Sequence, residues 1–63
     1  MKILNVRWMT TDVYIGLVLT EQDNENYVYI KSVPGLNEEE DITKILEWGT
    51  KINAKELINF LKG

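Results

Sequence analysis

The chain has 63 residues, which is enough for one domain, so we expect a single globular unit over residues 1–63. It contains no cysteine and no histidine, and ten acidic groups outnumber seven basic ones, which gives a net charge of −3. This composition removes disulfides, the usual zinc ligands and the commonest catalytic bases and nucleophiles. It also argues against duplex nucleic acid as a partner, because that binding depends on basic groups that neutralise phosphates.

The apolar content of 44% and charged content of 27% are typical of a folded domain. A chain this short buries only about 60% of its unfolded surface, so its folding margin is small and oligomerisation is a common remedy. No apolar run approaches the roughly 18 residues of a membrane span, and Asn5 and Arg7 interrupt the N-terminus too early for a signal peptide. With no cysteine, the chain suits a reducing compartment, and we expect a cytoplasmic protein without membrane contact.

The first half of the chain, residues 1–33, alternates with period two, which is typical of strands with one apolar face. We expect three strands, at residues 3–9, 13–20 and 27–33. A short polar break at 10–12 and a polar hairpin loop at 21–26 join them. Because such short connections favour antiparallel pairing, the three strands should form a meander.

Each predicted strand carries one apolar row. The rows are Leu4, Val6 and Trp8; Val13, Ile15, Leu17 and Leu19; and Val28 and Ile30. We expect all three rows to lie on one side of the sheet and to face the helices, since alternate strand residues project to the same side.

The second half of the chain follows a helical period. Asn37 is a candidate N-cap for a first helix that stops near Gly49, and Asp41 is a rival N-cap one turn later. Asn53 is the candidate N-cap of a second helix. Neither helix is long enough to be stable alone in water, so both should dock on the sheet.

The predicted fold class is therefore α+β: a three-stranded antiparallel β-meander followed by two short α-helices packed on one face of the sheet (βββαα). A four-stranded alternative, in which Lys51 and Ile52 form a brief edge strand, stays open.

Candidate metal and catalytic sites are weak. Glu21, Asp23 and Glu25 stand at positions one, three and five of a calcium-loop pattern. Asn26 replaces the turn glycine at position six, and Ser32 stands where the bidentate glutamate belongs. The acidic run at 38–41 is explained by a helix start, where the helix dipole favours anions. We expect no catalytic residue, no metal site and no cofactor.

The opposite side of the predicted sheet combines aromatic and cationic residues. The candidate partner-binding residues are Arg7, Tyr14, Tyr27, Tyr29 and Lys31. Tyrosine and arginine are enriched in protein interfaces, where the tyrosines supply contact area and the cations orient the partner. The sequence therefore favours a non-catalytic protein–protein interaction module, with a homodimer as its expected form.

Three other interpretations of these features stay open. Strand tyrosines can stabilise a sheet without any ligand. The same face could bind single-stranded nucleic acid, with bases stacked on the tyrosines and phosphates near the cations. The acidic run could instead mimic nucleic acid, as in small acidic inhibitor proteins of phage or plasmid type.

Overall fold

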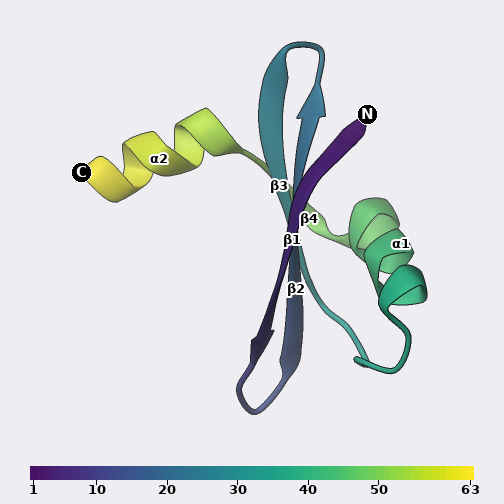
Figure 1. The fold of residues 1–63 in the computed structure, drawn as a ribbon. Coiled ribbons are helices and arrows are strands. Elements are labelled where there is room, and N and C mark those ends of the chain that lie inside the picture. The colour runs from purple at the N-terminus through teal and green to yellow at the C-terminus, as the bar shows by residue number, and fades with distance from the viewer.

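The computed structural model describes the whole chain, Met1–Gly63, as an α+β fold with a four-stranded antiparallel sheet and two helices (Figure 1). The elements in chain order are β1 (Lys2–Thr10), β2 (Tyr14–Gln22), β3 (Glu25–Ser32), α1 (Glu38–Trp48), β4 (Thr50–Asn53) and α2 (Ala54–Lys62). The strands lie in the spatial order β1-β2-β3-β4, so each pairs with its neighbour in the sequence. The predicted meander is present, and a fourth strand extends it.

A two-residue turn joins β2 to β3. Asp23 and Asn24 both have positive φ, 51° and 66°, as a type I′ hairpin turn requires at its two central residues. The predicted polar loop at 21–26 is therefore shorter than expected, because its outer residues continue the strand pairing. The turn sets a register in which Leu17 is opposite Ile30.

The fourth strand is the brief edge strand that the sequence left open. β4 pairs with β3 in antiparallel orientation, from Ile30 opposite Thr50 to Tyr27 opposite Asn53. This pairing gives hydrogen-bond partners to backbone groups of β3 that would otherwise lie at an open sheet edge.

Helix α1 begins after Asn37, whose side-chain oxygen accepts a hydrogen bond from the Glu40 backbone N–H at 3.1 Å. This confirms Asn37 as the N-cap and excludes Asp41 from that role. The Asp41 side chain is buried instead, and its Oδ2 accepts a hydrogen bond from the Gly35 backbone N–H at 3.1 Å. Gly35 has a φ of +77°, the conformation expected for the glycine after Pro34.

The core lies between α1 and one face of the sheet. Its buried apolar side chains are Val18, Tyr29, Val33 and Ile45. Six partly buried residues pack around them: Val6, Trp8, Tyr14, Tyr27, Ile42 and Leu46. The covered face is thus built from the aromatic residues of the sheet.

The predicted assignment of the two sheet faces was wrong. Tyr27 and Tyr29 lie on the side that α1 covers, whereas Val28 and Ile30 lie on the opposite side. Val6 and Trp8 of the β1 row do face α1, as predicted, but the register sets Val6 opposite Val18, so this row does not share a face with the Leu17 row.

Gly16 explains why α1 occupies the aromatic face. A methyl group at Gly16 would collide with Ile45 Cδ1 and would lie 2.6 Å from Trp8 Cζ3. The missing side chain therefore leaves the space into which the Ile45 side chain, fully buried on α1, inserts. The opposite face carries Ile15 and Leu17 at the neighbouring positions and has no such gap.

The prediction that both helices pack on one face was also wrong. Figure 1 shows α1 and α2 on opposite sides of the sheet, and no residue of α2 is buried. The radius of gyration is 11.9 Å, compared with about 10.6 Å for a typical compact domain of this length. Neither helix combines the length and apolar character that a membrane span needs.

The Gly16 contact gives a testable prediction. Gly16→Ala should lower the free energy of unfolding by about 1–3 kcal/mol, because the added methyl overpacks the core against Ile45. Ile45→Val removes the Cδ1 methyl that lies nearest to the added methyl. The stability loss of the double variant should therefore be smaller than the sum of the two single losses, by about 0.5 kcal/mol or more. Urea unfolding at one fixed protein concentration measures all four proteins. Strictly additive losses would contradict this account.

Candidate association surface

The face of the sheet opposite α1 carries a continuous aliphatic surface, which we call the open face. Its residues are Asn5, Arg7, Met9, Ile15, Leu17, Leu19, Val28, Ile30 and Ile52. They share this side because antiparallel partners in register project together, so Leu17 joins Ile30, and Leu19 joins Val28 and Ile52.

The central aliphatic residues of the open face are only half-buried in the chain. No element packs on them as α1 packs on the other side. A shallow hollow crosses β1, β2 and β3 there, lined by Asn5, Arg7, Leu17, Leu19 and Val28. Six neighbouring aliphatic side chains on one sheet face resemble half of a core more than an ordinary solvated surface.

Helix α2 carries a second apolar surface, which is partly uncovered. Ala54, Leu57, Ile58 and Leu61 recur at helical spacing and form its apolar stripe. Ile58 is 51% exposed and Leu61 is 72% exposed, although residues of this kind usually fix a helix to its own domain.

The start of α2 determines its direction. As predicted, Asn53 is the N-cap: its Oδ1 accepts hydrogen bonds from the backbone N–H groups of Lys55 and Glu56, at 2.9 and 3.3 Å. Asn53 is also the last residue of β4, so no linker separates strand from helix. The helix must therefore leave the sheet at the angle that this capped junction sets.

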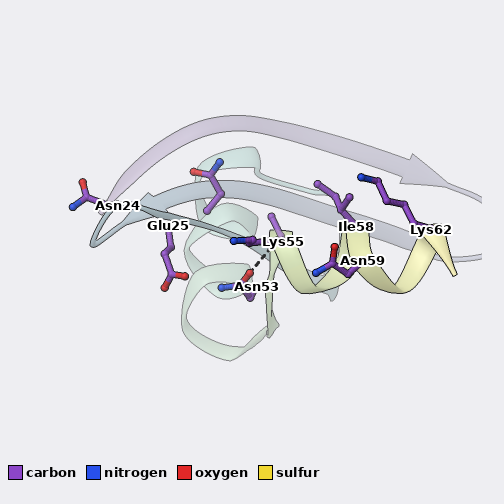
Figure 2. A pocket seen from close by; sticks show the side chains of 9 residues that line it. Asn24, Glu25, Asn53, Lys55, Ile58, Asn59 and Lys62 are labelled. Atoms are coloured by element: carbon purple, nitrogen blue, oxygen red, sulfur yellow. Dashed lines mark hydrogen bonds between the residues drawn. The ribbon is translucent and has the colours of Figure 1, made fainter.

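A groove opens between α2 and the β2–β3 turn. Figure 2 shows Lys55, Ile58 and Lys62 along the helix, with Asn24 and Glu25 at the turn. Most of the nine lining residues are polar, and only Ala54 and Ile58 are apolar. No buried side-chain nitrogen or oxygen in the chain lacks a hydrogen-bond partner. The groove lies beside the start of α2, and Ala54 and Ile58 of the apolar stripe line it.

The chain exposes more surface than its mass predicts. Its accessible area is 4839 Å², whereas a compact monomer of 7.3 kDa exposes about 4,200 Å². The excess of about 600 Å² approaches the roughly 800 Å² that each partner contributes to a standard protein interface.

The five sequence-predicted site residues do not lie together. Arg7 lies on the open face, beside Leu17. Tyr14, Tyr27, Tyr29 and Lys31 lie on the α1 side, and Tyr29 is only 8% exposed. These five side chains therefore do not share one exposed face.

The tyrosines have structural partners on the α1 side. Tyr14 stacks on Trp8 with ring centroids 5.4 Å apart, and the Tyr29 hydroxyl accepts a hydrogen bond from Gln22 Nε2 at 2.8 Å. Lys51 Nζ lies 4.3 Å from the centroid of the Tyr27 ring, within cation–π range.

Apart from Arg7, sequence reasoning did not select the residues of the open face or of the α2 stripe as a candidate contact surface. Their apolar rows were visible in the sequence, but they were assigned to the core. The sequence did not indicate which face of the sheet α1 covers, and this decides which apolar rows stay exposed.

The acidic run at 38–41 does not form one exposed surface, because Asp41 is 3% exposed and bonds to the Gly35 backbone. No group of three or more acidic side chains is arranged to hold a metal ion. Comparison with known protein families, curated proteins and solved structures gives no match for this chain.

Tyr27 offers a test of the hairpin geometry. Its hydroxyl donates a hydrogen bond to Glu25 Oε2 at 3.1 Å, and this bond, together with the negative charge of Glu25, raises the pKa of Tyr27 above its ordinary value. Because the folded pKa exceeds the unfolded one, the associated stability is present below the unfolded pKa and is lost as the pH rises through the folded pKa.

We expect Glu25→Gln to lower the pKa of Tyr27 toward its ordinary value, since the substitution removes the carboxylate charge. Ultraviolet absorbance of tyrosinate, recorded during an alkaline titration, follows the change, and Tyr27→Phe identifies which transition belongs to Tyr27. An unchanged Tyr27 transition in Glu25→Gln would contradict the hydrogen-bonded geometry.

Proposed function

We propose that this protein is a non-catalytic protein–protein interaction module that associates through its open face, with a homodimer as its working form. The observation that carries the proposal is the aliphatic surface around Leu17, Leu19 and Ile30, which has no covering element in the chain. Burying such side chains contributes about 1.5–3 kcal/mol each when the burial is complete. A partner on this face would supply the stability that a chain of this size gains with difficulty alone.

The composition supports the non-catalytic part of the proposal, because histidine and cysteine, the commonest general bases and nucleophiles, are absent. The absence of cysteine also suits the reducing cytoplasm, which we propose as its location.

Single-stranded nucleic acid is a weaker interpretation. A stacking platform needs exposed aromatic rings beside cations that meet the phosphates. Tyr29 is buried, and Arg7 lies on the other side of the sheet from all three tyrosines. The acidic-inhibitor interpretation is weakened in the same way, because Asp41 is directed into the protein.

The test of the proposal is a charge placed at the centre of the open face. We expect the wild-type chain to sediment as a dimer, and Leu17→Lys to raise the dissociation constant at least tenfold, or about 1.4 kcal/mol. Thr43→Lys adds the same charge on the exposed surface of α1 and should leave the constant within about threefold. Sedimentation equilibrium measures the constants, and circular dichroism verifies that each variant is folded.

Two outcomes would contradict the proposed association. One is a wild-type chain that stays monomeric at about 1 mM, where even an interaction of about 4 kcal/mol would be populated. The other is a dimer that Leu17→Lys and Thr43→Lys weaken equally, because association would then not depend on the open face.

A further inference from the structure

The molecule has two partly uncovered apolar surfaces, and they lie on the same side of the sheet. The open face lacks a covering layer, and Ile58 and Leu61 of the α2 stripe are exposed, whereas Ala54 and Leu57 are half-buried. α2 projects on the side opposite α1, which is the side of the open face (Figure 1). We propose that α2 of one copy docks on the open face of a second copy, and that the exchange is reciprocal. This inference rests on the proposed function and names its partner and contact.

The chain cannot cover its own open face with α2 at its present junction. β4 ends at Asn53 and α2 begins at Ala54. The backbone N–H groups of Lys55 and Glu56 donate hydrogen bonds to the Asn53 side chain at this junction. To lie flat on its own sheet, α2 would have to break this cap or separate β4 from β3. A second copy requires neither change, because it approaches the helix as it stands.

The two surfaces match in size. The nine residues of α2 span about 14 Å along the helix axis. The aliphatic row from Ile15 to Leu19 spans about 13 Å along β2. The helix and the aliphatic row are therefore similar in length.

The area available favours reciprocal docking over a simple contact between two sheet faces. Stacking of the two sheet faces alone does not use the α2 stripes, in which Leu61 is 72% exposed. Reciprocal docking covers two faces and two stripes in one two-fold arrangement, in which each copy both gives and receives a helix. The chain exposes about 600 Å² more surface than a compact monomer of its mass. This excess is comparable with the roughly 800 Å² that each partner buries in a standard interface.

The completed architecture explains the amphipathic pattern of α2. In the dimer each sheet has its own α1 on the aromatic face and the partner's α2 on the open face. The polar side of α2, with Lys55, Asn59 and Lys62, is left for solvent. Ile58 and Leu61 become core residues of the assembly, whereas in a single chain they are exposed.

Paramagnetic labelling tests the proposed contact directly. The chain has no cysteine, so Asn59→Cys gives one attachment point for a nitroxide on the polar side of α2. The labelled chain is mixed with isotope-enriched wild-type chain, so that only contacts between copies are observed. We expect broadened amide signals at Leu17, Leu19 and Ile30 of the enriched chain, and unaffected signals at Thr43 on α1.

A matched pair of charge variants gives the second measurement. Leu61→Lys places a cation in the apolar stripe and should raise the dimer dissociation constant at least tenfold. Asn59→Lys adds the same charge on the polar side of the same helix and should change it by less than about threefold.

The outcomes separate this inference from the proposed function. A dimer that Leu17→Lys dissociates but Leu61→Lys does not, with no broadening on the open face, would overturn helix exchange and leave association through the open face intact. A dimer that is insensitive to Leu17→Lys would overturn both. Broadening at Leu17, Leu19 and Ile30 together with loss of the dimer in Leu61→Lys would support the reciprocal arrangement.

Discussion

The insertion of Ile45 over Gly16 is the contact on which the rest of this structure depends. A missing side chain lets a helix approach a sheet more closely, and Gly16 supplies such a position near the start of β2. Once Ile45 occupies it, α1 covers the aromatic face and the larger aliphatic residues are left on the other side. The position of the uncovered open face therefore depends on one glycine.

The covered face is unusual in being lined by aromatic residues with polar ends. Tyr29 is enclosed by the core, yet its hydroxyl reaches the sheet margin and bonds to Gln22. Such a ring fills space beside a helix while keeping its polar atom satisfied, which an aliphatic residue does not need to do. Tyrosines in strands are thus compatible with a core role, and their polarity alone does not indicate a binding face.

The junction between β4 and α2 gives the molecule its asymmetry. Because Asn53 ends the strand and caps the helix, the helix direction is set by local hydrogen bonds rather than by packing. An amphipathic helix that projects from its own sheet gains stability when its apolar stripe is buried against another apolar surface. This geometry connects the local capping chemistry to the proposed assembly.

Local patterns in the sequence were sufficient for the α+β class, the meander, the two helices and the Asn53 cap, since period-two alternation and capping side chains act over a few residues; they left Asn37 and Asp41 as rival caps of the first helix. Asn37 and Asn53 are the caps in the structure. The sequence pattern could not predict which face of the sheet would contribute to the core, because both faces contain large apolar residues at alternating positions. That choice required the register of Val6 with Val18 and the fit of Ile45 at Gly16, which are contacts between residues distant in the sequence. Tertiary packing therefore decided where the uncovered surface lies.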